Sequence, residues 1–186
     1  MELIYPAETA PVLGPESFAA EMFPVVDASG FVLGQASRTY CHSGVRVLHP
    51  VVHLQIVDRF SRFYLQHRSE DKDMYPGLWD IAVGGHVSYG ESFAEALLRE
   101  AGEELGLFDF HPHSLGTTIY DDPEESELAA VYVAVGSYDL HPDHNEVQET
   151  RLWTMDEIDA AIGTGIFTPS FEKEYSLYKD RILAML

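Results

Sequence analysis

The stretch from Ser92 to Gly106 constrains the fold of this chain most, because it carries the local signals of one complete helix. Ser92 followed by Glu95 matches the capping box, a reciprocal side-chain pattern that begins helices. Apolar residues then recur at helical spacing, and Gly106 stands where a C-terminal cap belongs. Together these signals predict a helix from about Phe93 to Leu105.

At about 100° per residue, the predicted helix has two distinct faces. The expected core-facing side carries Phe93, Ala94, Leu97, Leu98, Ala101 and Leu105. Three carboxylates gather on an adjoining face, those of Glu100, Glu103 and Glu104. Ala96 precedes them on that face, and its small side chain leaves the carboxylates accessible.

These three glutamates break two local rules of helix stability. Like charges at i and i+4 cost roughly 0.2 to 0.5 kcal/mol, and acidic groups in a last turn oppose the negative end of the helix dipole. A cluster that breaks local rules without visible compensation is expected at functional sites. A divalent cation would turn the repulsions into attractions. The simpler alternative is a solvated acidic face on an acidic protein.

The amino-acid composition limits the kinds of molecule that this protein is expected to bind. The chain has 186 residues with 11 Lys plus Arg against 31 Asp plus Glu, a net charge of -20. We therefore expect neither a nucleic-acid duplex nor an anionic membrane surface as partner. Small anionic substrates would need a metal ion as intermediary. Cys41 is the single cysteine, which excludes an intramolecular disulfide framework and indicates a reducing cytoplasm.

The first 20 residues have neither a basic region nor a long apolar run, so we expect neither a signal peptide nor a membrane anchor. We expect a poorly ordered arm over residues 1–20 and a single domain over 21–186. Apolar runs around Asp27 and Gly30 predict a hairpin over 22–37.

The remaining patterns predict alternating strands and helices. A short helical turn is expected over 37–42, strands over 51–58, 62–68, 79–87, 114–120, 128–135 and 148–153, and terminal helices over 154–162 and 171–186. Strands with helices between and after them indicate an α/β or α+β sandwich.

The helix belongs to a longer spacing pattern that begins at Gly85. Five residues separate Gly85 from Glu91, and seven separate Glu91 from Arg99; then follow Glu100, Ala101, Glu103, Glu104, Gly106 and Leu107. This pattern resembles the Nudix box, the signature of the Nudix hydrolase family. Residues 21–42 and 63–87 are also similar to the Nudix branch related to isopentenyl diphosphate isomerase, and the likeness covers about residues 21–160.

The resemblance implies an α/β/α sandwich with a mixed sheet and an N-terminal hairpin, and a loop-helix-loop that binds Mg²⁺ or Mn²⁺. It implies Glu100, Glu103 and Glu104 as metal ligands, with the Gly85 carbonyl as a further ligand. Catalytic roles fall to Glu103, Glu100, Arg99 and Glu127. Glu91 and Arg99 are expected to hold the loop against the helix, and Gly106 to end the helix. Hard cations of this kind prefer carboxylates, waters and substrate phosphates, which agrees with the assignment.

The same branch leaves two chemistries open. In the isomerases an essential cysteine directly precedes a Gly-His segment, and Gly84 holds that position here. The isomerases also disrupt the Arg-Glu-x-x-Glu-Glu core, which this chain keeps whole. Their active-site tryptophan aligns loosely with Gly165. All three departures favour hydrolysis of a diphosphate linkage by a metal-dependent pyrophosphatase. An isomerase and a non-catalytic nucleotide-sensing module remain alternatives.

Several residues outside the helix are candidates for substrate contact. Arg68, Lys72 and His86 stand where related proteins contact the substrate or its metal, although each is equally interpretable as a solvated loop residue. Pro50 replaces an arginine after His49, which removes one phosphate contact. Glu125 and Glu127 resemble the paired acids of the isomerase site, and Glu146 and Glu149 are weaker candidates. The substrate is expected to be a small nucleoside diphosphate-linked or related phosphorylated compound, and a homodimer stays open.

Overall fold

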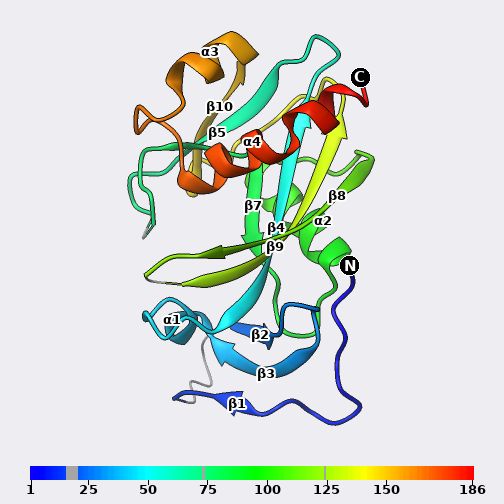
Figure 1. The fold of residues 1–186 in the computed structure, drawn as a ribbon, viewed down its shortest axis with the longest axis vertical. Helices are drawn as coiled ribbons and strands as arrows, with labels where there is room; N and C mark the ends of the chain where they lie inside the picture. Colours follow the sequence, from blue (N-terminus) through cyan, green and yellow to red (C-terminus); the bar gives the residue numbers. More distant parts are fainter. Residues whose placement is uncertain (16–20, 73, 124) are drawn as a thin grey trace. The chain divides into compact units, whose positions relative to one another are not determined.

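The computed structural model describes residues 1–15, 21–72, 74–123 and 125–186, and its elements are labelled in Figure 1. The helices are α1 (Arg38–Cys41), α2 (Phe93–Leu105), α3 (Met155–Ala161) and α4 (Pro169–Leu183). The strands are β1 (Val12–Leu13), β2 (Met22–Val26), β3 (Val32–Ser37), β4 (Leu48–Val57), β5 (Phe63–Arg68), β6 (Trp79–Asp80), β7 (Val83–His86), β8 (Pro112–Asp121), β9 (Ser126–Val135) and β10 (Val147–Trp153). None of the helices in the described ranges is long and apolar enough to cross a membrane.

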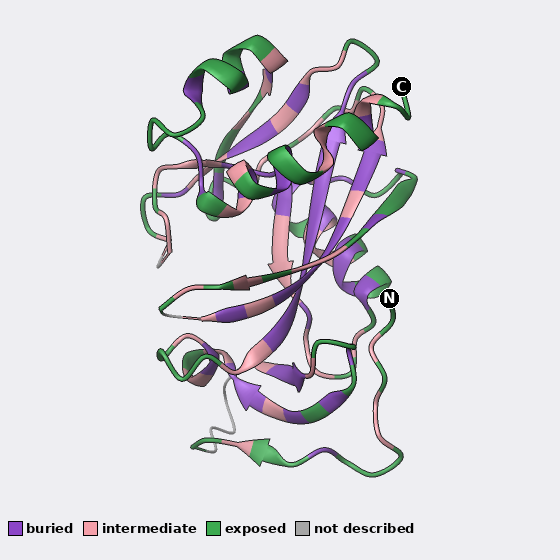
Figure 2. Ribbon diagram, viewed as in Figure 1, coloured by how far each residue is buried: buried purple, intermediate pink, exposed green. Residues whose placement is uncertain are grey.

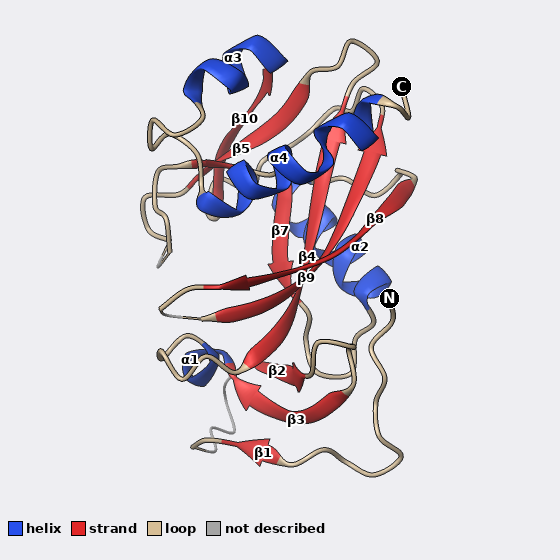
Figure 3. Ribbon diagram, in the orientation of Figure 1, coloured by secondary structure: helices blue, strands red, loops and turns tan. Residues whose placement is uncertain are grey.

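The strands form two sheets of mixed character. In the smaller sheet, of order β1-β3-β2, β1 is parallel and β2 antiparallel to β3. In the larger sheet the order is β10-β5-β4-β9-β8, with β6 paired to β5 and β7 paired to β4. Strands and helices are mixed along the chain (Figure 3). The expectation of a mixed α+β fold is therefore confirmed.

The chain divides into two compact units. Unit 1 comprises Met1–Val52, Gly85–Leu97 and Gly116–Val131, and unit 2 comprises His53–Gly84, Leu98–Leu115 and Tyr132–Leu186. Five elements contribute residues to both units, namely β4, β7, β8, β9 and α2. The sequence-based division into an arm and one domain stays a prediction.

In unit 1, the described part of the N-terminal segment makes regular backbone contacts. The Ile4 N–H donates to the Gly30 carbonyl at 2.9 Å, Ala10 is buried, and β1 pairs with β3. Residues 16–20 of the expected arm lie outside the described residues. The hairpin predicted over 22–37 is confirmed by β2 and β3, whose turn is closed by the Asp27 carboxylate. That carboxylate accepts the Ser29 N–H at 2.8 Å.

The core of unit 1 includes a cluster of Phe23, Val25, Ala36 and Cys41. Cys41 is fully buried in α1, in the short helical turn that the sequence predicts. Burial raises the pKa of its thiol to about 12. The thiol therefore stays protonated at neutral pH and acts as a small apolar side chain.

In unit 2, β5 pairs antiparallel with β10. The end of β4 also pairs antiparallel with β5, with Ile56 opposite Tyr64. Strand β4 is buried along nearly its whole length, as Figure 2 shows. At the end of β10, aromatic rings pack edge to face: the Trp153 ring centroid lies 5.3 Å from that of Trp79 in β6 and 5.1 Å from that of Phe167. These contacts anchor the segment that leads into α4.

One predicted strand is interrupted. The sequence predicts a continuous strand over 79–87, but the structure has the shorter β6 and β7 there. The Asp80 carboxylate accepts the Ile81 N–H at 2.8 Å and the Thr168 hydroxyl at 2.6 Å. These bonds direct the backbone out of the ladder between the two strands. A local side-chain bond of this kind competes with strand pairing.

Helix α2 has the predicted bounds, and both of its caps are formed. The Ser92 N–H donates to Glu95 Oε2 at 2.8 Å, and the Glu95 N–H donates to Ser92 Oγ at 3.3 Å. At the other end Gly106 takes φ of 61°, and the Leu107 N–H donates to the Ala101 carbonyl at 3.0 Å. A left-handed residue at this position lets the chain leave the helix with its last carbonyls satisfied.

The buried side of α2 differs from the predicted one. Ala94 is exposed and Leu98 is 49% exposed, whereas Ala96 and Glu104 are buried. The buried stripe is therefore rotated by about one position from the expected apolar side. Hydrophobic periodicity fixes the helix but leaves the edges of its buried stripe to the neighbouring elements, and here they cover a glutamate in place of a leucine.

The left-handed C-cap gives a first testable prediction. Gly106→Val should lower the free energy of unfolding by about 1–2 kcal/mol, because a branched side chain at positive φ is strained. Gly106→Asn should cost less, since asparagine tolerates this conformation. Urea unfolding of the three proteins measures the difference. Equal stability of the valine and asparagine variants would contradict the assigned cap.

Candidate functional site

The C-terminal half of α2, in unit 2, carries three carboxylates in graded exposure. Glu103 is the outermost, with 63% of its side chain exposed. Only 14% of the Glu100 side chain is exposed, and Glu104 is buried at 3%. We call these three residues the carboxylate face. The predicted grouping is thus present, but its members occupy very different environments.

Arg99 offsets part of the repulsion on this face. Its Nη1 donates to Glu100 Oε1 at 2.8 Å and to Glu103 Oε2 at 3.1 Å. One guanidinium therefore bridges the two outer carboxylates and fixes their spacing. Glu91, in unit 1, accepts the Ser88 N–H at 2.9 Å and so braces the turn before the helix.

Glu104 has weak hydrogen-bond partners for a buried carboxylate. Its Oε2 accepts the Gly84 N–H at 3.3 Å and the Gln66 side-chain amide at 3.4 Å, both longer than typical charge-assisted bonds. Burial raises the pKa of Glu104 to about 8, opposed by the charge of Lys72 and assisted by that of Glu100. Burial likewise raises the pKa of Glu100, which Arg99 opposes. A nearby cation would lower the pKa of both groups.

The two predicted basic residues are engaged in different ways. Arg68 donates to Asp80 Oδ2 at 3.1 Å and to the Met74 carbonyl at 2.8 Å, so it braces the loop after β5. Lys72 is ion-paired with Glu146, and its charge acts on Glu104. Of these two residues, Lys72 is therefore the one whose charge acts on the carboxylate face.

The loop that carries Glu146 is attached to the end of α2. The Asp143 N–H donates to the Glu104 carbonyl at 3.1 Å, and the His141 N–H donates to the Leu105 carbonyl at 2.8 Å. The Asp143 side chain in turn accepts the Val147 N–H at 2.9 Å. These bonds satisfy carbonyls that a helix end otherwise leaves unpaired.

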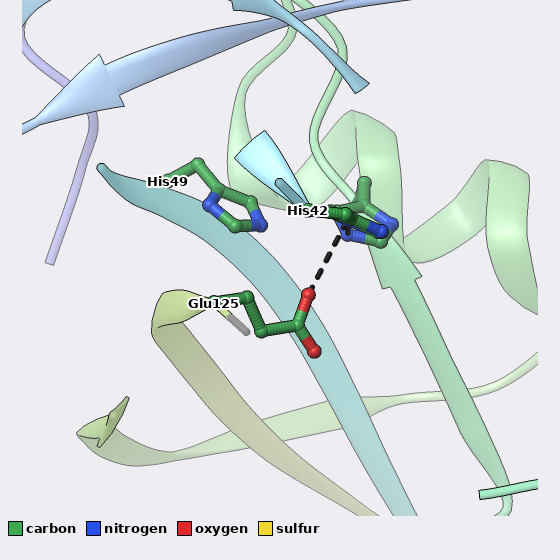
Figure 4. A group of neighbouring side chains, drawn as sticks. His42, His49 and Glu125 are labelled. Carbon is green, nitrogen blue, oxygen red and sulfur yellow. Dashed lines mark hydrogen bonds and ion pairs between the residues drawn. The ribbon is translucent and has the colours of Figure 1, made fainter. Parts of the chain in front are cut away.

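A second cluster of ligating side chains lies in unit 1. The histidine cluster, as we name it, consists of His42, His49, His86 and Glu125, each offering one ligand atom within 4.8 Å of the others. His42 Nε2 lies 3.0 Å from His86 Nε2 and 3.3 Å from Glu125 Oε2. Figure 4 shows the His42 ring and the Glu125 carboxylate directed toward each other, with the His49 ring beside them.

His49 is the innermost member. It is fully buried, its Nδ1 lies 3.0 Å from the Val47 carbonyl, and its Nε2 has no hydrogen-bond partner among the described residues. Burial lowers the pKa of His49. The ring is therefore neutral at physiological pH, with Nδ1–H donating to the backbone and Nε2 free to donate its lone pair. That is the form in which imidazole binds metals.

Packing holds the rings of this cluster in place. His86 stacks on Phe23 with 4.4 Å between centroids, and His49 stacks on His86 at 5.4 Å. His86 Nε2 also lies 3.9 Å from Glu127 Oε1. The structure thus brings together three candidates from the sequence, His86, Glu125 and Glu127.

Sequence reasoning missed His42 and His49 as members of a site. A signal was present: the two histidines are seven residues apart and flank the segment that enters β4. The seven-residue interval spans a helical turn and a loop, so no regular periodicity places both side chains on one side. Only the folded arrangement shows their proximity to His86.

Comparisons with known proteins assign the family. Residues 47–171 match the NUDIX domain family. The chain is 32% identical over 166 residues to an uncharacterised Nudix hydrolase of Streptomyces coelicolor, covering 88% of this chain and 91% of that one. The chain therefore belongs to the Nudix hydrolase family.

The chain is also similar to a curated isomerase and to a solved structure. It is 28% identical over 148 residues to isopentenyl-diphosphate Delta-isomerase of Mycolicibacterium vanbaalenii, covering 75% of this chain and 80% of the relative. The crystal structure of the protein DR0079 from Deinococcus radiodurans matches with a TM-score of 0.70 and 23% identity, covering 87% of this chain and 98% of that one. The last likeness shows the shared fold.

Burial of Glu104 generates a prediction about pH. Its folded-state pKa of about 8 exceeds the ordinary value of 4.5, so between these values the folded state holds a proton that the unfolded state lacks. Its contribution to stability is then full below pH 4.5 and is lost as pH rises through 8. In a metal chelator, Glu104→Gln should therefore stabilise the protein more at pH 8 than at pH 5, by up to a few kcal/mol.

Urea unfolding at the two pH values measures this difference. Glu103→Gln is the matched control, because it removes an exposed carboxylate from the same helix turn. An effect of Glu104→Gln that is equal at pH 5 and pH 8 would contradict the assigned environment.

Proposed function

We propose that the protein is a metal-dependent hydrolase that cleaves a diphosphate linkage in a nucleoside diphosphate-linked compound. The observation that carries the proposal is the carboxylate face, three glutamates at one helix end whose innermost member, Glu104, is buried with only weak partners. A buried carboxylate in that position is destabilising unless a cation accompanies it. Membership of the Nudix hydrolase family agrees with this reaction.

The residues present fit Mg²⁺ or Mn²⁺. Oxygen ligands from one or two carboxylates, supplemented by waters and substrate phosphates, are the set that such cations prefer. Glu100, Glu103 and Glu104 would hold the ion. When bound, the ion neutralises charge on the diphosphate and lowers the pKa of a bound water. Hydrolysis then joins the water oxygen to phosphorus, and the bridging oxygen leaves with the electron pair of its broken P–O bond.

The protein's own side chains supply the remaining functions. Arg99 donates to both Glu100 and Glu103 and sets their spacing, and its charge opposes the rise that burial causes in the pKa of Glu100. Glu103 is the most exposed of the three, which suits it to take a proton from water as general base. Lys72 would exchange its pairing with Glu146 for a substrate phosphate. Arg68 would act indirectly, by bracing the loop on which Lys72 lies.

The isomerase alternative lacks a proton donor at the position expected for it. Gly84 has no ionisable side chain, although a Cβ there would meet Ile81 and His53 only at ordinary contact distances of 3.4 and 3.6 Å. A cysteine would thus be tolerated sterically but is absent. We therefore infer that the protein does not protonate an isoprenoid double bond. A nucleotide-sensing module would have no need of the whole carboxylate face.

Activity measurements test the proposal directly. With Mg²⁺ or Mn²⁺, we expect phosphate or nucleotide release from at least one compound in a panel of nucleoside diphosphate sugars, dinucleoside polyphosphates and nucleoside triphosphates. Glu103→Gln and Glu104→Gln should each lower kcat at least about 100-fold without unfolding the domain. Glu8→Gln, an exposed change far along the chain, is the control. Undiminished turnover by either variant, or in a metal chelator, would refute the mechanism.

We further propose that the histidine cluster binds a transition metal such as Zn²⁺. The supporting observation is the buried Nε2 of His49, which lacks a partner among the described residues and lies within 4.8 Å of three other ligand atoms. Imidazole nitrogens suit transition metals better than Mg²⁺. The two clusters thus have different ligand chemistry and are expected to select different ions.

Metal titration tests this second site. Zn²⁺ binding measured by calorimetry should weaken by at least about 100-fold in His49→Leu. His113→Leu serves as control, since His113 is exposed and outside the cluster. Mg²⁺ binding should be the same in both variants. If His49→Leu and His113→Leu bound Zn²⁺ equally well, the cluster would not be a metal site.

A further inference from the structure

Gln66 is a buried amide beside the carboxylate face. It lies on β5, is 1% exposed, and donates from Nε2 to Glu104 Oε2 at 3.4 Å. Its Oε1 is also buried and has no hydrogen-bond partner among the described residues. Only one end of the amide is therefore satisfied, and that end faces Glu104.

Exchanging the oxygen and nitrogen of the Gln66 amide would not give both atoms a hydrogen-bond partner. If its two ends were exchanged, an oxygen would face the Glu104 carboxylate and the nitrogen would be left without an acceptor. Either orientation leaves one buried polar atom unpaired, which costs about 1–3 kcal/mol. In native proteins such an atom usually marks a bound water or ion.

The interactions of the Glu104 carboxylate are also incomplete. Among the described residues it accepts two hydrogen bonds, from Gly84 at 3.3 Å and Gln66 at 3.4 Å, which are both long and both reach the same oxygen, Oε2. The carboxylate needs more positive charge than Lys72 provides, since burial still raises its pKa, and the neighbouring amide oxygen needs a hydrogen-bond donor, since it has none among the described residues. A hydrated divalent cation supplies both at once, because the cation binds carboxylate oxygen and its remaining waters are strong donors.

We propose that Gln66 is a positioning residue outside the Nudix box, whose Oε1 accepts a hydrogen bond from a water bound to the cation that Glu104 holds. Nε2 of the same side chain orients Glu104. The inference rests on the proposed function of the carboxylate face and adds to it a residue from another element. An amide takes no proton at neutral pH, so Gln66 orients this water and leaves its deprotonation to another group.

Protein stability in the absence of metal distinguishes a positioning role of Gln66 from a structural one. Gln66→Leu removes the amide and both of its polar atoms while keeping similar volume. In a chelator we expect this variant to be as stable as the wild type or more stable, because an unpaired buried oxygen is lost. With Mn²⁺ present we expect a smaller rise in melting temperature than in the wild type.

Mn²⁺ is the probe for the experiment itself. Its dissociation constant, measured by electron paramagnetic resonance, should rise about 10- to 100-fold in Gln66→Leu, the range found for residues that orient metal ligands. Water-proton relaxation should report a changed hydration of the bound ion, and kcat should fall more than KM changes. Gln148→Leu, the same replacement at an exposed position on β10 next to β5, is the control.

The outcomes separate the two proposals. If the wild type bound no Mn²⁺ through Glu104, the proposed function and this inference would both be wrong. If the wild type bound Mn²⁺ and hydrolysed its substrate while Gln66→Leu matched it in affinity, hydration and kcat, only this inference would be overturned. A loss of stability in chelator with unchanged Mn²⁺ binding would likewise assign Gln66 a purely structural role.

Discussion

The burial of Glu104 is the constraint on which the proposed chemistry depends. A helix normally places its acidic residues toward its N-terminus or in solvent, yet here an acidic residue in the last turn is 3% exposed. Arg99 compensates the outer two glutamates, Glu100 and Glu103. The protein therefore maintains a buried group whose charge its hydrogen-bond partners only partly satisfy. Protonation stabilises this carboxylate when no metal is bound, and a bound cation would stabilise its charged form.

The two proposed metal sites differ in their ligand atoms. The carboxylate face, in unit 2, is all oxygen, and the histidine cluster, in unit 1, is mostly imidazole. Gly84 is the residue that weighs against isomerisation, because it leaves the site without the donor that the chemistry requires.

The sequence predicted those features that depend on local interactions. Helix α2 was predictable because its caps lie within the helix and its flanking residues, and the hairpin over 22–37 because Asp27 closes its own turn. The break between β6 and β7 was not predictable, since it depends on Thr168, which is 88 residues from Asp80. Likewise, the histidine cluster joins a loop, two strands and Glu125, whose proximity no spacing along the chain reveals. The buried Oε1 of Gln66, which has no hydrogen-bond partner within the described ranges, also follows from packing alone.

Metal-dependent stability is the most direct test of the central claim that the carboxylate face binds a cation. The melting temperature should be measured at pH 8.5 in Mg²⁺ and in sodium salt of equal ionic strength, for the wild type and Glu104→Gln. Mg²⁺ suits the test because the imidazole nitrogens of the histidine cluster are poor ligands for it. Ligand binding at a hundredfold excess over Kd stabilises by about 2.7 kcal/mol, so Mg²⁺ should raise the wild-type melting temperature by several degrees and leave Glu104→Gln nearly unchanged. Identical melting curves in the two salts for both proteins would contradict the account.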